Sequence, residues 1–196
     1  AIAMLREHLA GGRLRRTASD APEKLSLGRL DVPRDDYGNR PALLRRVMEY
    51  YHETFMRETA ASEYLARRGL ADAEAVRTFR IGFAARSLGF RLPTSTTKKS
   101  PLRGALAEVG ILRADSGHEH LAGSLVIPIV DECGVVKGMY GRKLRDDLRA
   151  GTPKHLYLPG PHEGVWNPQT FTASRDIILC EALLDALTFW CAGHRN

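Results

Sequence analysis

The 196-residue sequence predicts an α+β protein: a helical N-terminal part, then a small mixed sheet built around a hairpin, then one strand leading into a helix. Apolar residues follow helical spacing from residue 43 to residue 78. Two apolar runs separated by Glu132–Cys133–Gly134 then predict the hairpin. A further run, Ile177–Cys180, passes directly into a helical pattern. This order indicates two small α/β pieces rather than one continuously wound sheet.

The regular elements are expected only after a long irregular start. Residues 1–42 predict a partly disordered linker, because residues 11–42 are rich in Gly, Pro, Arg and Asp and lack sustained periodicity. Residues 43–172 are expected to form one subdomain, and residues 173–196 to begin another. Because the chain does not start with Met, we expect a fragment of a longer protein.

The predicted elements differ in their periodicity. Helical spacing, with Asp72 near one start and Gly69 and Gly110 after two ends, indicates the helices. Short apolar runs bounded by turn residues indicate the strands. The expected helices are 43–57, 62–68, 71–78 and 101–109; the expected strands are 80–84, 121–131, 135–144 and 177–180, and a last helix follows residue 180.

Composition excludes several classes of protein. Hydrophobic residues make up 43% and charged residues 27%, which is ordinary for a globular protein. No apolar run approaches the roughly 20 residues that span a bilayer, so no membrane partner is expected. The three cysteines are too few for a four-ligand zinc site, and their odd number argues against a disulfide framework. The sequence has no Walker phosphate loop, GxSxG elbow or HExxH motif. Its net charge of +6 is compatible with binding a polyanion.

The strongest local motif is a pair of carboxylates after the last predicted strand. Glu181 directly follows Ile177–Cys180, and open α/β sheets place ligands at the carboxyl ends of their strands. Asp185 lies four residues later, so both carboxylates would share one helix face. Such a pair suits Mg²⁺ or Mn²⁺, which prefer oxygen ligands. A solvated acidic first turn, favourable to the helix dipole, is the alternative that spacing alone leaves open.

A series of cations accompanies the predicted hairpin. Because alternate strand residues point to one face, part of this series is expected to line a track for a phosphate backbone. The cations are Lys137, Arg142, Lys143, Arg145 and Lys154, with Tyr140, Tyr157 and Trp166 as candidate base-stacking surfaces. A solvated cluster of loop charges, with the rings in the core, is the alternative.

Five motifs, taken in order, resemble the catalytic core of bacterial primases of the DnaG type. AASEYLARRGLADAEAVRTFRIGFA (60–84) resembles the segment that opens this core, and LVIPIVDECGVVKGMYGRKL (125–144) resembles its hairpin. TPKHLYLPG (152–160) and GVWNPQTF (164–171) stand where the family carries two further motifs. ILCEALLDAL (178–187) is similar to the first motif of the family's Toprim domain. The resemblance leaves the predicted linker unexplained.

The resemblance implies a DNA primase, which condenses ribonucleoside triphosphates on a single-stranded DNA template. Residues 43–172 would be its N-terminal, template-binding subdomain, and residues 173–196 would begin the Toprim domain. Glu181 would be the catalytic Toprim glutamate and would ligate Mg²⁺ or Mn²⁺ together with Asp185. Arg142 and Lys154 would guide the template. The implied partners are the template, the nucleotides and a replicative helicase or fused helicase domain, all in the cytoplasm.

The chain departs from the family in several places. Ser124 stands where relatives usually carry Arg, Asp131–Glu132 replaces a turn that is often basic, and Ala182 replaces the glycine after the key glutamate. These changes suggest a divergent branch of mobile-element type. The family's zinc ribbon and the Toprim DxD aspartates have no counterpart in the sequence. Zinc is therefore expected only in a ribbon before residue 1, and the fragment alone is expected to be inactive.

Two other functions remain open from the sequence. One keeps the Toprim fold for a topoisomerase-like or nuclease-like enzyme, against which the primase-like helices and hairpin argue. The other is a non-catalytic nucleic-acid-binding module of a mobile-element protein. A DxD motif after residue 196 and a Cys/His ribbon before residue 1 of the parent protein would favour the primase.

Overall fold

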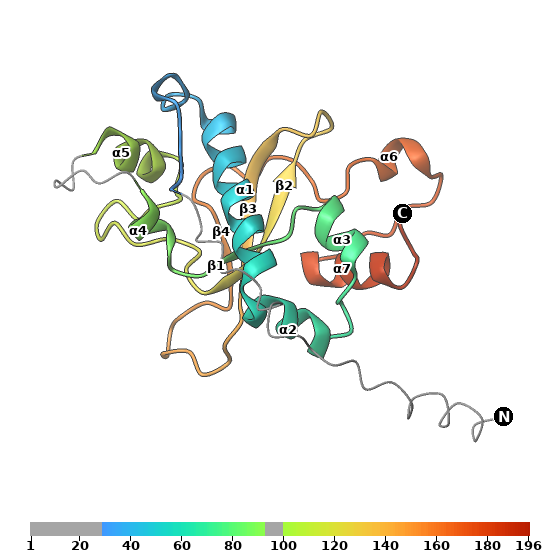
Figure 1. Cartoon of the computed structure of the whole chain (residues 1–196). Coiled ribbons are helices and arrows are strands. Elements are labelled where there is room, and N and C mark those ends of the chain that lie inside the picture. The colour runs from blue at the N-terminus through green and yellow to red at the C-terminus, as the bar shows by residue number, and fades with distance from the viewer. Residues whose placement is uncertain (1–28, 93–99) are drawn as a thin grey trace, which may run out of the picture.

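The computed structural model describes residues 29–92 and 100–196, and a four-stranded antiparallel sheet lies at its centre (Figure 1). The strand order follows the chain, with β1 Gly82–Ala84, β2 Ser124–Val130, β3 Val136–Lys143 and β4 His155–Tyr157. The helices are α1 Arg40–Arg57, α2 Thr59–Arg67, α3 Ala73–Thr78, α4 Leu88–Arg91, α5 Pro101–Glu108, α6 Thr170–Ala173 and α7 Leu183–Cys191, and a 3-10 helix η2 spans Arg34–Asp36. Helices combined with a small antiparallel sheet confirm the predicted α+β class.

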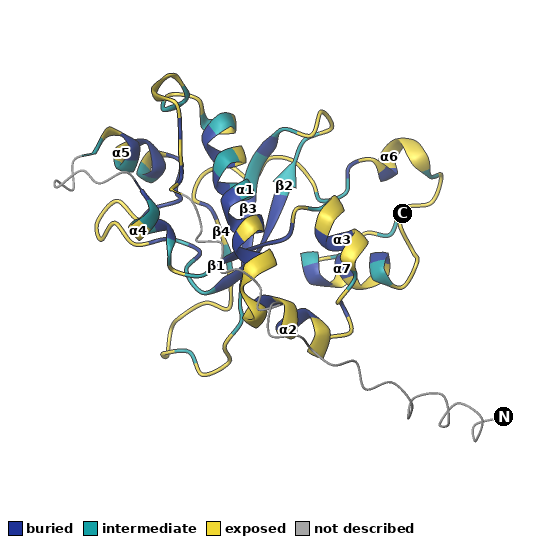
Figure 2. Cartoon of the chain, in the orientation of Figure 1, coloured by how far each residue is buried: buried dark blue, intermediate teal, exposed yellow. Residues whose placement is uncertain are grey.

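The longest helix, α1, crosses one face of the sheet (Figure 1). Asn39 caps its start by accepting a hydrogen bond from the Ala42 N–H at 3.2 Å, and Pro41 occupies the first turn. Its buried apolar residues recur at helical spacing: Leu43, Leu44, Val47, Tyr50, Tyr51 and Phe55. Figure 2 shows buried residues gathered in the strands that α1 crosses. The helix therefore forms because its apolar stripe covers the sheet.

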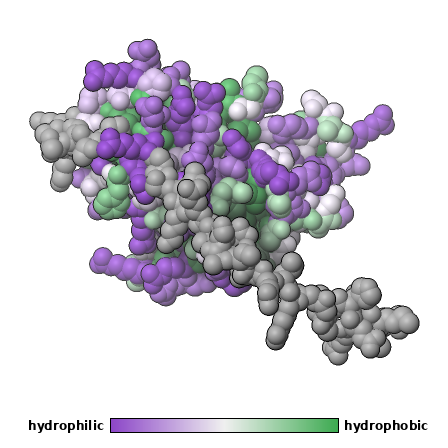
Figure 3. Space-filling view, in the orientation of Figure 1, coloured by the Kyte–Doolittle hydropathy of each residue, from purple (hydrophilic) through white to green (hydrophobic). Residues whose placement is uncertain are grey.

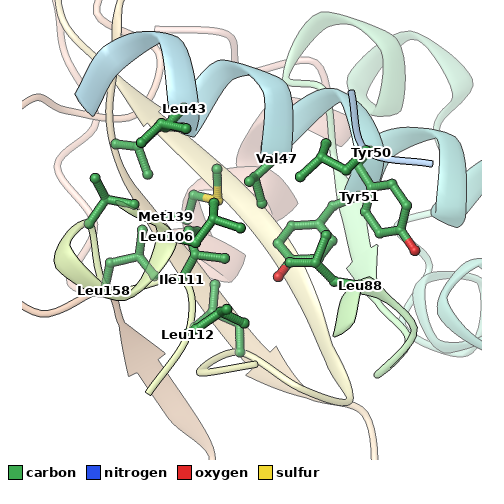
Figure 4. Close-up of a cluster of buried hydrophobic side chains, with 14 of the residues drawn as sticks. Leu43, Val47, Tyr50, Tyr51, Leu88, Leu106, Ile111, Leu112, Met139 and Leu158 are labelled. Atoms are coloured by element: carbon green, nitrogen blue, oxygen red, sulfur yellow. The ribbon is translucent and has the colours of Figure 1, made fainter. Parts of the chain in front are cut away.

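The sheet separates two hydrophobic clusters, because alternate residues of each strand point to opposite faces. Val126 and Met139 belong to the cluster with α1, α4 and α5, part of which Figure 4 shows. Leu125 and Tyr140 belong to the cluster with α2, α3 and α7. The register pairs Leu125 with Arg142, so Arg142 lies on this second face. Lys143, the next residue along β3, therefore points to the first face.

Strand β1 and helix α1 approach each other very closely. A Cβ atom at Gly82 would lie 2.7 Å from Tyr51 Cβ and 2.8 Å from the Tyr51 carbonyl carbon, a distance that real Cβ contacts do not show. On the same part of α1, His52 Nδ1 lies 2.8 Å from the Ile81 carbonyl oxygen. The absence of a side chain at residue 82 allows this packing.

The β2–β3 hairpin is confirmed, and its acidic turn has a structural role. Asp131 Oδ1 accepts hydrogen bonds from the N–H groups of Cys133 and Val135, each at 2.9 Å. Gly134 adopts a φ of +77°, a conformation that favours glycine. The Val135 N–H and the neighbouring Lys137 both lower the pKa of Asp131. The ionised aspartate thus closes the hairpin turn.

Most predicted elements are confirmed with shifted ends. The four expected helices correspond to α1, α2, α3 and α5, and the first three expected strands correspond to β1, β2 and β3. Helix α1 begins at Arg40 rather than at residue 43, because Asn39 caps it. The sequence patterns did not reveal β4, α4, α6 and η2, since elements of three or four residues are too short for periodicity to register.

Part of the predicted linker is packed. Residues 1–28 lie outside the described residues, but Leu30 and Val32 are buried in the cluster with α1. The Leu30 N–H also donates to the Arg91 carbonyl oxygen at 3.0 Å. Residues 29–42, which the sequence assigned to the linker, are therefore partly packed and include η2 and the start of α1. Leu30 and Val32 follow Leu25 and Leu27 in a short run that Gly28 and Arg29 interrupt, so they carry no sustained periodic signal, although both are core residues.

The predicted strand Ile177–Cys180 is not formed. Within the described parts of the chain it has no strand partner, and its Ile178 N–H donates only to the Asn196 carbonyl oxygen, at 3.1 Å. Leu179 is 94% exposed. Apolar composition predicts a strand, but a strand exists only through pairing with a neighbour. The helix expected next is confirmed as α7, which packs Leu187 into the second cluster.

The surface in Figure 3 is largely hydrophilic, with small hydrophobic areas between the charged side chains. None of the helices that the structure describes is long and apolar enough to cross a membrane. Several large apolar residues near the C-terminal end are exposed: Val165, Phe171, Ile177, Leu179 and Phe189. Phe90 on α4 is a further exposed ring, in a different part of the fold.

Candidate nucleic-acid interface

A cleft of about 750 Å³ lies between α4, α5, the loop 112–122 and the end of β3. We call it the basic cleft because its lining includes four cations: Arg86, Arg103, Arg113 and Lys143. Its other ionisable lining residues are Asp115, His118, Glu119 and His120. The cations come from widely separated parts of the sequence, so only the fold brings them together.

Two arginines of the basic cleft are fixed against glycines. Arg103 Nη2 donates to the Gly89 carbonyl oxygen at 2.7 Å. Arg86 has a φ of +66°, and its guanidinium packs against Gly123, where a Cβ atom would lie 3.3 Å from Nη2. A non-glycine residue in the left-handed region is uncommon and carries strain. The hydrogen bond holds the Arg103 guanidinium at the cleft, and the Arg86 guanidinium lies against Gly123.

The cations of the basic cleft repel one another. Burial lowers the pKa of Lys143, and the charges of Arg86 and Arg113 lower it further. Lys143 Nζ donates one hydrogen bond, to the Ala122 carbonyl oxygen. A bound anion would relieve the repulsion that Arg86 and Arg113 exert on Lys143.

The acidic residues of the cleft do not pair with these cations. Glu119 is 7% exposed, and its Oε1 accepts a hydrogen bond from the Leu88 N–H at 2.7 Å. The Tyr51 hydroxyl donates to Glu119 Oε2 at 3.4 Å. Asp115 Oδ1 accepts from the Ser116 N–H at 2.7 Å. The charge of Arg86 opposes the rise that burial causes in the pKa of Glu119, and the charge of Arg113 adds to the lowering that the Ser116 N–H causes in the pKa of Asp115. However, no ion pair among the described residues involves a cation of the basic cleft.

An exposed aromatic ring lies at the basic cleft. Phe90 lines the cleft and is 89% exposed, which is unusual for a phenylalanine. His120, also in the lining, has a pKa that burial lowers, and its Nε2 lies 3.0 Å from the Tyr157 carbonyl oxygen. That distance identifies a donated bond, which the neutral ring can supply. Cations beside an exposed ring suit a nucleic-acid single strand, whose phosphates and bases need both.

The two adjacent cations predicted at the end of the hairpin face opposite sides of the sheet. Lys143 lines the basic cleft. Arg142 lies on the other face, is 8% exposed, and donates from Nε to the Tyr64 hydroxyl at 3.3 Å. Its Nη1 lies 3.2 Å from His155 Nε2. The predicted basic series therefore does not form one surface.

The remaining predicted cations are paired with nearby aspartates. Lys137 pairs with Asp131 at 3.3 Å, and Lys154 pairs with Asp146 at 2.9 Å. Arg145 forms a two-bond contact with Asp147. These pairs are solvent-accessible, so they compete only weakly with another anion. The structure brings none of the three residues into the basic cleft.

The predicted stacking surfaces mostly serve packing. Tyr140 is 1% exposed in the second cluster. The Trp166 ring packs against Phe79 with centroids 4.1 Å apart. Tyr157 is 38% exposed, and its ring packs against His162 with centroids 4.8 Å apart.

The predicted carboxylate pair lies at the start of α7, away from the basic cleft. Glu181 and Asp185 are both exposed, and Asp185 belongs to the first turn of the helix. Glu181 lines a separate cavity of about 350 Å³, together with Tyr157 and Trp166. The lining of that cavity contains no Lys or Arg. Residues 29–92 and 100–196 bring together no group of three or more His, Cys, Asp and Glu side chains able to hold a metal ion.

The arginines of the basic cleft were not predicted from the sequence. Arg86 and Arg113 lie between predicted elements, Arg103 lies within the predicted helix 101–109, and the three form no charge run. Phe90 likewise reads as an ordinary core residue until its exposure is known. The one sequence signal that pointed toward the cleft was Lys143 at the end of the hairpin strand.

The fold is that of DNA primase catalytic cores. The DnaG primase catalytic domain bound to ssDNA is 23% identical with a TM-score of 0.65, and the match covers 82% of this chain and 55% of that chain. The zinc-binding and RNA polymerase domains of the Aquifex aeolicus primase are 25% identical with a TM-score of 0.63, covering 85% of this chain and 42% of that chain.

The family model for the DNA primase catalytic core, N-terminal domain, matches residues 50–166, and the chain belongs to this family. A DNA primase of Aquifex aeolicus is 28% identical over 165 residues, covering 78% of this chain. A DNA primase of Campylobacter jejuni is 26% identical over 198 aligned positions, covering 91% of this chain. The chain spans 32% of the length of the first and 31% of the second. The resemblance to the primase catalytic core is confirmed over residues 50–166, and the motif at 178–187 lies beyond this match.

Proposed function

We propose that this chain is the template-binding part of a DNA primase, and that single-stranded DNA lies in the basic cleft. The observation that carries this proposal is the group of four cations without ion-pair partners among the described residues, beside the exposed ring of Phe90. Phosphates would lie against the cations, and a base would stack on Phe90. Counterion release on phosphate contact would supply most of the affinity.

The comparisons support DNA as the ligand. A similar primase catalytic domain has been solved bound to ssDNA. The RNA polymerase domain of the Mycobacterium tuberculosis primase, 21% identical with a TM-score of 0.60, has been solved with a double-stranded DNA oligomer carrying a 6-nucleotide overhang. In this chain the unpaired strand is the better ligand for the basic cleft, because only unstacked bases expose a face to an aromatic ring.

Arg142 extends the proposed template path around the end of β3. Arg142 lies on the opposite face of the sheet from Lys143 and is 8% exposed, so the DNA strand would pass around the end of β3 to reach its guanidinium. The guanidinium of Arg142 forms no ion pair with a carboxylate among the described residues. Lys137, Arg145 and Lys154 would contact the DNA only if a phosphate replaced the aspartate in each of their ion pairs.

The proposed reaction of the full-length protein is primer synthesis from ribonucleoside triphosphates. Glu181 and Asp185 are exposed oxygen donors of the kind that Mg²⁺ and Mn²⁺ prefer, so they fit a metal site completed by other carboxylates. Such ions would neutralise the triphosphate and activate the primer hydroxyl. We infer that the 196-residue fragment binds template but does not synthesise primers. A zinc ribbon, a helicase partner and a cytoplasmic location belong to this proposal for the full-length protein.

The test is binding of a fluorescently labelled single-stranded oligodeoxynucleotide to the 196-residue chain, followed by anisotropy at several salt concentrations. We expect Arg86→Ala and Arg113→Ala each to weaken binding. Each should also lower the slope of log affinity against log salt, by about 0.7 for each lost phosphate contact. Phe90→Ala should weaken binding with the slope unchanged, since a stacked base releases no counterion.

Arg45→Ala is the matched control, because Arg45 is an exposed arginine that lines a different cavity. It should leave both affinity and salt slope near their original values. Equal effects of Arg45→Ala and Arg86→Ala would show that the strand binds by general charge rather than in the basic cleft. Tighter binding of a blunt duplex than of the single strand would also contradict the proposal.

A further inference from the structure

Arg142 is a buried cation whose contacts are all neutral. Its Nε donates to the Tyr64 hydroxyl at 3.3 Å, and its Nη1 lies 3.2 Å from His155 Nε2. The described residues offer its Nη2 no acceptor, and the nearby Asp146 pairs with Lys154 rather than with Arg142. A guanidinium removed from water needs every available partner. Its orientation therefore depends on two side chains from other elements, Tyr64 on α2 and His155 on β4.

The contact with Arg142 fixes the protonation state of His155. Arg only donates hydrogen bonds, so His155 Nε2 must be the acceptor and must carry no proton. The proton of the neutral ring then lies on Nδ1, which is 2.7 Å from the Tyr140 hydroxyl oxygen and donates to it. Tyr140, with a pKa that burial raises to about 12, stays a neutral hydroxyl. The two hydrogen bonds that link Tyr140, His155 and Arg142 are thus compatible with one arrangement of protons.

We propose that His155 is a positioning residue: its neutral ring holds the Arg142 guanidinium so that the free Nη2 edge meets a phosphate of the template strand. This role rests on the proposed function, because it acts through the contact of Arg142 with DNA. His155 is chosen over Tyr64 because its Nε2 is the only acceptor at Nη1 that the described residues supply. A ring nitrogen without a proton accepts this bond and adds no negative charge beside Arg142.

The surroundings of His155 favour the neutral ring. Burial lowers its pKa, and the nearby charges of Arg142, Arg68 and Lys154 lower it further. Arg68 lies over the Tyr64 ring with its Cζ 5.0 Å from the centroid. Asp146, the one acid in this group, is paired with Lys154 at 2.9 Å. A second proton on His155 would point Nε2–H at an N–H of Arg142, so both geometry and charge oppose it.

The first experiment tests the positioning without DNA. Nitrogen-15 NMR of the histidine rings in the 196-residue chain should show His155 at pH 7.5 as the neutral tautomer with its proton on Nδ1. The Arg142 side-chain signals should shift in His155→Phe and return toward their original positions in His155→Gln, whose amide oxygen can accept the same bond. A proton found on Nε2 would overturn the proposal, whatever the chain binds.

The second experiment tests the consequence for binding, with the labelled single strand as probe. His155→Phe should weaken binding roughly fivefold, the effect of one net hydrogen bond, and His155→Gln should recover to within roughly twofold. In the Arg142→Ala background, His155→Phe should cause no further loss, because its effect passes through Arg142. Two results would refute the role: affinity losses of Arg142→Ala and His155→Phe that multiply in the double variant, or a His155→Gln affinity as low as that of His155→Phe. If Arg142→Ala leaves binding unchanged, the DNA contact of Arg142 is wrong and His155 positions nothing for it, while the basic-cleft variants still judge the proposed function separately.

Discussion

Glu119 places a carboxylate in the interior beside the basic cleft. Its two oxygens accept hydrogen bonds from the Leu88 N–H and the Tyr51 hydroxyl, and burial raises its pKa above the ordinary value of 4.5. An acid whose pKa is higher in the folded state binds more protons when folded. The favourable effect of its protonation on folding is therefore full below pH 4.5 and is lost as the pH rises through the raised pKa.

This linkage predicts the behaviour of Glu119→Gln. The amide keeps an oxygen acceptor for the Leu88 N–H but carries no charge. The variant should match the original chain in stability below pH 4.5, where Glu119 is protonated. It should become more stable than the original chain as the pH rises through the raised pKa of Glu119, and the difference should then level off. Urea unfolding at a series of pH values measures the difference.

Glu119→Ala serves as the contrast, because it leaves the buried Leu88 N–H without an acceptor. It should cost about 1–3 kcal/mol at low pH, where no charge is involved. A stability difference between the Gln variant and the original chain that stays constant from pH 4 to pH 8 would contradict the assigned environment.

At the scale of elements, the contact of α1 with β1 depends on Gly82. A methyl group there would meet the Tyr51 backbone, which cannot move aside as a flexible side chain can. Gly82→Ala should therefore lower the free energy of unfolding by about 1–3 kcal/mol, the usual cost of overpacking. Thermal or urea unfolding checks this.

Gly104→Ala on α5 is the matched control. A Cβ atom at this position would have no neighbour within 4 Å. Alanine in a helix interior is more favourable than glycine by about 1 kcal/mol, so this variant should be slightly more stable. Similar stability losses in both variants would mean that the close approach at Gly82 is not what limits packing.

The elements themselves were predictable where their own residues carry the information. Helix α1 repeats its buried residues at helical spacing, and the β2–β3 hairpin shows two β-rich runs around a turn. The apolar run Ile177–Cys180 predicted a strand as clearly, but a strand forms only by pairing with a neighbour, which the sequence of the run itself does not reveal. For Leu30 and Val32 the error was the reverse: they were assigned to a linker but are buried, because their burial depends on contacts with distant segments.

At the scale of the whole molecule, the candidate site was only partly predictable. Lys143 was identified, but the three arginines of the basic cleft meet it only through the folding of α4, α5 and the loop 112–122. Arg142 and Lys143 were predicted together, although the strand pleat sends them to opposite faces. Charge counting finds cations, whereas a shared surface is a property of the tertiary structure.

The full-length protein allows a test of the roles proposed for separate parts of the molecule. Glu181 lies at α7, whereas the basic cleft lies beside α4 and α5. Glu181→Gln should therefore abolish primer synthesis, since a carboxylate in the proposed metal site is lost, while single-strand affinity stays within about twofold. Primer extension assays and anisotropy on the same preparation measure both. Retained synthesis would remove Glu181 from the proposed catalytic role.

The burial of Leu30 and Val32 has a consequence for how the boundaries of this protein are drawn. The family match begins at residue 50, in the middle of α1, whereas the two apolar side chains that complete the cluster with that helix come from well before it. A chain shortened to the matched span would lose half of α1 together with Leu30 and Val32. Water would then reach the face of the sheet that α1 covers. The structural unit thus begins well before residue 50, where the family match begins.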